Sequence, residues 1–153
     1  MRESFVQLIN EVRSSGRYCG PEFFQATTPV VWNEQLFNAA LGHSNDMATN
    51  NFFSHTGSDG LSLADRATNA GYPFRIVGEN IAAGQYTTAE AVDSWVNSSG
   101  HCRNLMNPAF TEVALACVEN PGSDYQRYWT NVLGDRFRGE SRVGNVPITR
   151  AMP

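Results

Sequence analysis

The chain has 153 residues, of which 41% are apolar and 17% are charged, and its formal net charge is −4. This length fits one domain, and a chain of this size buries roughly two-thirds of the surface that its unfolded form exposes. The low charge content excludes a disordered polyelectrolyte and a coiled coil. No apolar run approaches the ~20 residues of a membrane span. A mildly acidic chain whose 11 basic residues are all arginine also lacks the basic footprint of a nucleic-acid-binding protein.

The first third of the chain predicts two amphipathic helices. Apolar residues recur with the spacing i, i+3, i+4, i+7 at Phe5, Leu8, Ile9 and Val12, which is typical of one buried helix face. This helix should end near Ser14 to Gly16, because glycine supplies a left-handed cap. A loop over 17–31 should precede a second helix over 34–50, with Asn33 as its N-cap.

The middle of the chain combines polar turns with shorter helices. A turn-rich loop over 54–60 should lead into a short helix over 61–70. The apolar segment 74–84 is interrupted by Gly78-Glu79-Asn80, so the carboxylate must be either exposed at a bend or paired. Thr87-Thr88-Ala89-Glu90 matches a capping box and predicts a helix over 88–98.

The last third of the chain changes character. Thr111 to Val118 and Arg127 to Leu133 are rich in apolar, aromatic and β-branched residues, which predicts two antiparallel strands. We expect residues 138–153 to form an extended or poorly ordered tail, so that residues 1–137 form the domain. Helices followed by strands indicate the α+β class.

Three residues far apart in the sequence stand out as chemical groups. His55 and His101 follow small polar residues or glycine, and Glu79 lies between them in an apolar stretch. Two imidazoles and one carboxylate would suffice for a zinc site with an open position. Their spacing matches no local metal motif, so surface histidines and a backbone-bonded glutamate remain the alternative. His43 lies on an apolar helix face and is expected in the core.

The three cysteines include no C-x-x-C pair, which excludes a zinc knuckle and a thioredoxin-like motif. Cys117 falls on one strand face with Val113 and Leu115, so we expect it to be buried and to pack as a small hydrophobic residue. Cys19 and Cys102 are placed in loops at helix ends, and we predict a disulfide between them. Cys102–Cys117 is the alternative pairing.

Short motifs spread along residues 5–137 together resemble the CAP superfamily of cysteine-rich secretory proteins, venom allergens and plant pathogenesis-related proteins. They occur in the order typical of that family: Ile9-Asn10-Glu11-Val12-Arg13 (isoleucine replacing the family's histidine), Ser54-His55, Gly78-Glu79-Asn80-Ile81-Ala82, Trp95 with Gly100-His101, and Tyr128-Trp129-Thr130. Details such as Gly100-His101-Cys102 resemble the secreted bacterial branch.

The resemblance implies an α-β-α sandwich with a small, mostly antiparallel sheet between helix layers. It implies that His55, Glu79 and His101 converge in a cleft that can hold zinc, with magnesium as the alternative. Further residues are expected at or behind the cleft wall, namely Ser54, Asn80, Ser98 and Trp95. The family often has a second glutamate where this chain has Ser98, so a bound cation would rely on water for the missing ligand.

The resemblance also implies a secreted or periplasmic protein, although no signal peptide is visible in this chain. We expect a monomer that binds a small molecule, a lipid or sterol, or a protein, without established catalysis. One alternative is a metal-assisted or serine-dependent hydrolase that uses the same cleft. Another is a structural interaction module in which the cleft has no role, because fold alone does not decide function.

Overall fold

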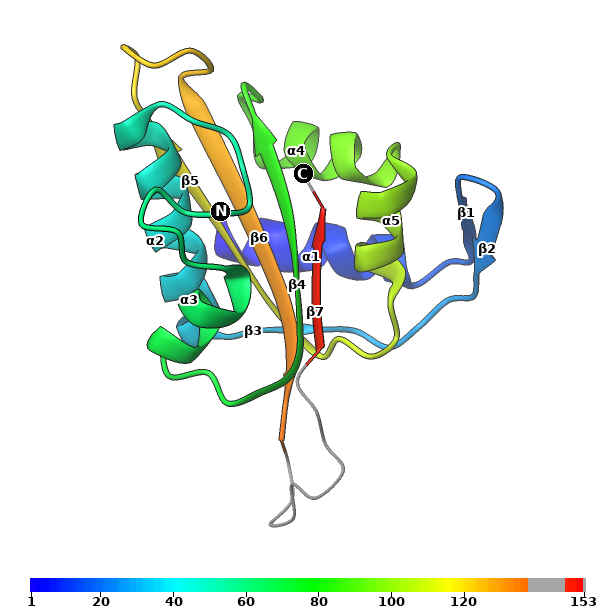
Figure 1. Cartoon of the computed structure of the whole chain (residues 1–153). Helices are drawn as coiled ribbons and strands as arrows, with labels where there is room; N and C mark the ends of the chain where they lie inside the picture. The colour runs from blue at the N-terminus through cyan, green and yellow to red at the C-terminus, as the bar shows by residue number, and fades with distance from the viewer. Residues whose placement is uncertain (138–147, 153) are drawn as a thin grey trace.

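The computed structural model describes residues 1–137 and 148–152, with side chains described for 1–137 and for Met152. Figure 1 shows the elements along the chain. The helices are α1 (Arg2–Arg13), α2 (Glu34–Asn50), α3 (Leu63–Asn69), α4 (Thr88–Val96) and α5 (Ser99–Met106). The strands are β1 (Arg17–Cys19), β2 (Glu22–Phe24), β3 (Val31–Trp32), β4 (Phe74–Ala83), β5 (Glu112–Glu119), β6 (Arg127–Arg136) and β7 (Ile148–Met152).

A five-stranded mixed sheet forms the centre of the molecule, in the order β3-β5-β6-β4-β7. The long strands β5, β6 and β4 pair antiparallel, as predicted for the first two of them. The short outer strands β3 and β7 pair parallel to β5 and β4. A separate hairpin of β1 and β2 lies beside α5.

Helices cover both faces of this sheet, so the predicted α+β class and α-β-α sandwich are confirmed (Figure 1). Side chains alternate along β5: Val113 and Leu115 pack with α1, α4 and α5, whereas Ala114 and Ala116 pack with α2 and α3. This alternation follows from the two-residue repeat of a strand. Small alanines on the α2 face let that long helix lie close to the sheet.

Several elements differ from those expected from the sequence. Segment 74–84 contains strand β4, residues 17–24 contain the β1–β2 hairpin, and the helix that ends at Val96 is followed at once by α5. His101 and Cys102 therefore lie in a helix, not in the loop that was expected. Within the expected tail, 148–152 form strand β7, and 138–147 and 153 lie outside the described residues.

The predicted disulfide is present and ties the hairpin to α5. Cys19 and Cys102 are bonded, with their Cα atoms 5.4 Å apart. Cys117 is the free cysteine and is half-buried on the predicted face of β5, and burial raises the pKa of its thiol to about 11. That thiol is therefore protonated and poorly nucleophilic at neutral pH.

The motif at the end of α1 has a structural role. The buried guanidinium of Arg13 donates hydrogen bonds to four carbonyls, those of Thr28, Leu105, Asn107 and Phe110. Asn10 pairs with the backbone of Val30 through both its amide nitrogen and its oxygen. These bonds fasten α1 to the segments that lead into β3 and out of α5.

In the part of the chain that the structure describes, no helix is long and apolar enough to cross a membrane.

Candidate functional site

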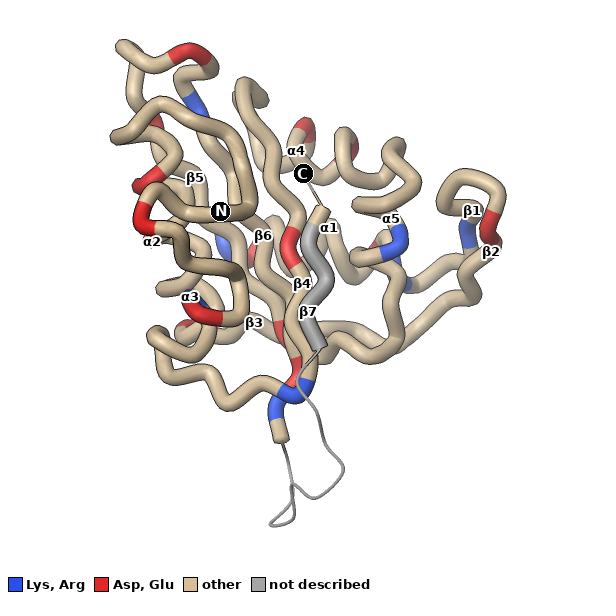
Figure 2. Tube along the Cα trace, viewed as in Figure 1, with Lys and Arg blue, Asp and Glu red and all other residues tan. Residues whose placement is uncertain are grey.

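Glu79 lies in the middle of β4 and is completely buried. Figure 2 shows an acidic position within the central sheet near the label of β4, and the sequence of this strand contains one acidic residue, Glu79. Its carboxylate accepts hydrogen bonds from His55 Nδ1 at 2.8 Å and from Arg66 Nη1 and Nη2 at 2.7 and 3.0 Å. Burial alone would raise the pKa of Glu79, but the His55 hydrogen bond and the Arg66 charge outweigh it and hold the pKa below its usual value. The carboxylate is therefore ionised, and it is paired, which is one of the two outcomes that the sequence left open.

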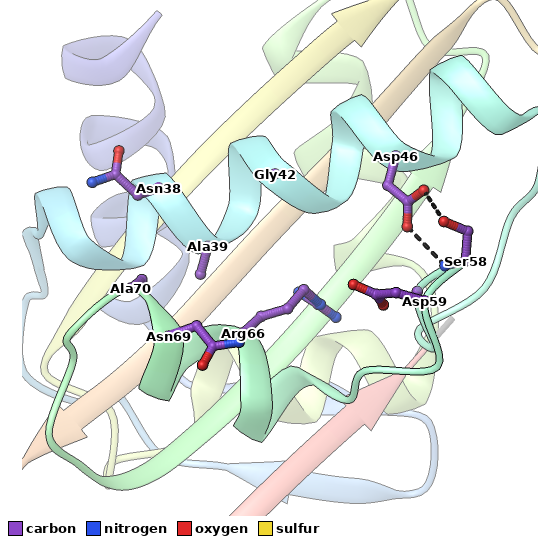
Figure 3. Close-up of a pocket in the computed structure, with 10 residues that line it drawn as sticks. Asn38, Ala39, Gly42, Asp46, Ser58, Asp59, Arg66, Asn69 and Ala70 are labelled. Carbon is purple, nitrogen blue, oxygen red and sulfur yellow. Dashed lines mark hydrogen bonds between the residues drawn. The ribbon is translucent and has the colours of Figure 1, made fainter.

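Arg66 also belongs to the site and was not identified from the sequence. It projects from α3, whose first turn is fixed by a capping box between Ser62 and Asp65. Figure 3 shows its side chain extending from α3 into the space beside α2 and the loop that carries Asp59. Besides Glu79, its Nη2 also donates to the carbonyl of His55 at 3.0 Å. One guanidinium thus fixes both the carboxylate and the backbone of the histidine.

His55 lies in the loop between α2 and α3. Because the ionised Glu79 can only accept, His55 Nδ1 carries the proton of their hydrogen bond, and when the ring holds this one proton, Nε2 keeps its lone pair. Nε2 is buried and has no hydrogen-bond partner among the described residues. The loop itself is held by the core residue His43, whose Nε2 contacts the carbonyl of Ser54 at 2.7 Å.

His101 lies in the first turn of α5, three residues after the N-cap Ser98. Its Nδ1 is 2.8 Å from Ser98 Oγ, and its Nε2 is buried with no partner in the described part of the chain. Burial, and secondarily the nearby charge of His55, lower the pKa of His101. The ring is consequently neutral at pH 7. Ser98, which stands where the family often has a glutamate, acts here as the hydrogen-bond partner of a histidine.

A buried amide network locks α5 against the sheet behind the histidines. Asn104 of α5 donates to the carbonyl of Glu79 and to Asn80 Oδ1, at 3.3 and 3.1 Å. Asn80 in turn donates to Asn131 Oδ1 on β6 at 3.2 Å. Asn80 was expected behind the site, whereas Asn104 and Asn131 were not identified from the sequence. A buried asparagine in a predicted strand is the signal that could have indicated Asn131.

The cavity beside His101 has a volume of about 300 Å³. Trp95 lines it, as expected of a cleft-wall residue, and its indole Nε1 donates to the carbonyl of Ile81 at 3.0 Å. Neither His55 nor Glu79 lines this cavity. Ser54 is exposed, and its hydroxyl accepts from the backbone N–H of Thr56 at 3.2 Å.

The contacts among the predicted residues therefore differ from those of a metal site with three protein ligands. Both oxygens of Glu79 are occupied by Arg66 and His55. Across the described residues, no group of three or more histidine, cysteine, aspartate or glutamate side chains is placed to hold a metal ion. Glu79 orients His55, an arrangement that is common for the carboxylate behind a metal-binding imidazole.

The sequence of residues 6–133 matches the model of the cysteine-rich secretory protein family, CAP. The chain belongs to this family. Among curated proteins, it is 38% identical over 96 residues to the uncharacterized protein YkwD of Bacillus subtilis, covering 63% of this chain and 37% of that protein. It is 35% identical over 104 residues to the uncharacterized membrane protein YlbC of the same organism, covering 68% of this chain and 28% of that protein. This CAP chain thus spans about a third of the length of these relatives.

Solved structures of the family share the fold. An extracellular protein of Bacillus anthracis that contains an SCP domain superimposes with a TM-score of 0.70 at 31% identity, over 88% of this chain and 40% of that one. An outer surface protein of Borrelia burgdorferi gives a TM-score of 0.69 at 16% identity, over 89% of this chain and 90% of that one. At that identity the second likeness supports the fold alone.

Proposed function

We propose that this CAP domain acts outside the cytoplasm as a ligand-binding domain in which His55 and His101 together hold a divalent cation weakly. The observation that carries this proposal is the pair of buried imidazole Nε2 atoms without partners in the described structure. Each ring is oriented through Nδ1, by Glu79 or by Ser98. A buried polar atom without a partner costs free energy, so such atoms favour a bound species.

The donor set fits a cation with two protein ligands and water in the remaining positions. Imidazole nitrogen suits zinc better than magnesium, which prefers oxygen ligands. The lowered pKa of His101 keeps that ring neutral and ready to bind metal at pH 7. A cation bound there would polarise oxygen atoms of a ligand, while Glu79 and Arg66 hold the His55 ring in place.

An extracellular location is supported by the relative from Bacillus anthracis, which is described as extracellular. We propose that its ligand is a small molecule, such as a lipid or sterol, or a protein. We propose that it acts as a monomer.

A hydrolase using the same residues has weaker support. Ser98 contacts His101 Nδ1, but in the described structure nothing orients His101 from Nε2, as the third member of a catalytic triad would. Glu79 is held by a two-point ion pair with Arg66 and has a lowered pKa, which makes it a poor general base.

Calorimetric titration with zinc chloride tests the cation site. We expect wild-type protein to bind one zinc ion, and His55→Ala and His101→Ala to bind about tenfold more weakly or not at all. Circular dichroism should show that both variants remain folded. Equal heats for the wild type and for both variants would contradict the proposal.

A further inference from the structure

The cavity beside His101 is a mixed aromatic and polar site at one end of β4. Ile81, Ala82 and Ala83 line it along the end of β4, and Phe53, Trp95 and Tyr125 contribute aromatic rings. At about 300 Å³, its volume is at the small end of the range for ligand pockets. It therefore suits a small ligand or the end of a larger one.

Two of the aromatic rings are exposed yet held in place. Phe53 is 37% exposed and Tyr125 is 52% exposed, and their ring centroids lie 6.1 Å apart. The edge of Tyr125 packs on Tyr128, and the backbone N–H of Tyr125 donates to the Tyr128 hydroxyl at 3.2 Å. The adjacent Asp124 N–H donates to Asn51 Oδ1 at 2.9 Å. Ordered, exposed rings at a cavity mouth offer flat apolar surface at low entropic cost.

The polar groups of the cavity point to a ligand that brings its own hydrogen bonds. Gln85 Oε1 and His101 Nε2 both belong to lining residues, are buried, and have no partner in the described structure. Gln85 is fixed by its carbonyl, which accepts from Trp129 Nε1 at 2.9 Å. Gln85 Oε1 needs a donor, whereas His101 Nε2 needs a donor or an acceptor according to its tautomer. Hydroxyl groups satisfy both requirements.

The residues that line the cavity also argue against a charged ligand. None of the lining residues is an arginine, lysine, aspartate or glutamate. A carboxylate head group would find no arginine or lysine among these lining residues, and an acyl chain alone would leave both polar atoms unpaired, which costs free energy.

We propose that this cavity binds a neutral saccharide. The C–H face of a pyranose ring would pack on Tyr125 and Phe53, and its hydroxyl groups would bond Gln85 Oε1 and His101 Nε2. This inference rests on the proposed function, because both assign ligand binding to the region around His101. It is tested without metal, so that the two can fail separately.

The test is a titration of ¹⁵N-labelled protein with tri-N-acetylchitotriose in the presence of EDTA, followed by NMR. We expect the indole signal of Trp95 to shift in a saturable way, and that of Trp32, which does not line the cavity, to stay constant. Decanoate and N-acetyl-trialanine amide, in parallel titrations, represent an acyl chain and a peptide. Saturation by either of them at lower concentration than by the saccharide, or no Trp95 shift with the saccharide, would overturn the proposal.

Variants separate stacking and hydrogen bonding from folding. Tyr125→Ala should weaken saccharide binding about tenfold, as expected for loss of a central aromatic contact. Gln85→Met, which keeps the side-chain size and removes the acceptor, should weaken it similarly. The matched control is Tyr18→Ala, because Tyr18 is 69% exposed and packs on Phe23 in the β1–β2 hairpin. Equal saccharide affinity in Tyr125→Ala and the wild type would also overturn the proposal.

Zinc calorimetry on the same variants distinguishes the two proposals. Tyr125→Ala should bind zinc as the wild type does, because Tyr125 holds neither imidazole. Saccharide binding without zinc binding would remove the cation from the proposed function and leave this inference standing. Zinc binding without saccharide binding would overturn this inference and leave the cation of the proposed function standing.

Discussion

His55 and His101 both present buried Nε2 atoms without a partner among the described residues, but the two rings are held in different ways. His55 is fixed by a charged network, in which a buried carboxylate bonds both the ring and Arg66. His101 is fixed by a neutral serine on its own helix, next to a disulfide-bonded cysteine. The comparison teaches that one half of the site depends on charge balance, whereas the other depends on local helix geometry and a covalent link.

The charged half should be the more fragile. Arg66→Met leaves the Glu79 carboxylate buried with His55 as its remaining partner, so we expect a loss of about 3–5 kcal/mol in the free energy of unfolding. Urea denaturation measures this loss in the free energy of unfolding. The matched control is Arg2→Met, which removes an exposed ion pair with Glu34 and should cost less than about 1 kcal/mol.

A double variant tests whether charge is the cause. Glu79→Gln combined with Arg66→Met removes both charges, so the double variant should be more stable than Arg66→Met alone. If the two losses simply add, the fragility comes from packing instead of an unpaired charge.

Loss of the disulfide should affect the His101 half. Replacing both Cys19 and Cys102 with alanine opens a link across 83 positions of sequence, for which we expect a loss of about 2–5 kcal/mol. Thermal or urea unfolding measures the loss, with Cys117→Ala as the free-cysteine control. Equal stability of the double variant and this control would contradict the covalent role.

The stability of the fold should decrease in two steps as the pH is lowered. Burial lowers the pKa of His43 and of His101, so the unfolded chain binds more protons than the native one from their folded pKa values up to about 6.5. Their contribution to stability is complete above pH 6.5 and is lost as the pH falls. The contribution of Glu79 persists until the pH falls below about 4.5. Denaturation curves from pH 8 to pH 3 should show both steps. Constant stability between pH 7 and pH 5 would contradict the first.

The smallest effect is expected at Ser98. Ser98→Ala removes the hydrogen bond to His101 Nδ1 and should cost about 1 kcal/mol of stability. The same change should weaken zinc binding about tenfold, because a support behind a metal-binding imidazole is lost. Calorimetry on Ser98→Ala and Ser94→Ala compares two serines of adjacent helices, of which only Ser98 contacts His101. Equal zinc affinities would contradict the positioning role.

Local sequence signals predicted the parts of the fold that local physics determines. The apolar periodicity of α1, the Asn33 N-cap of α2 and the alternation of β5 all act within a few residues. Strand β4 was not predicted, because Gly78, Glu79 and Asn80 interrupt its apolar pattern. Helix α5 was missed because Gly100 follows a polar helix end.

The parts of the site that local sequence signals mark were also predicted. Its histidines and Glu79 could be identified by their residue types and by the family motifs, and the disulfide from the positions of the cysteines. The pairing of Glu79 with Arg66 depends on how α3 packs beside β4, which no local pattern encodes. A buried carboxylate requires a cation, but the sequence does not say which of its 11 arginines supplies it.

The most direct test of the site is ¹⁵N NMR of the histidine rings, recorded with and without zinc. Our account predicts that His55 carries its proton on Nδ1 and that zinc shifts the Nε2 signals of His55 and His101 while leaving His43 unchanged. A proton on His55 Nε2, or zinc shifts confined to His43 or to Nδ1 atoms, would contradict it.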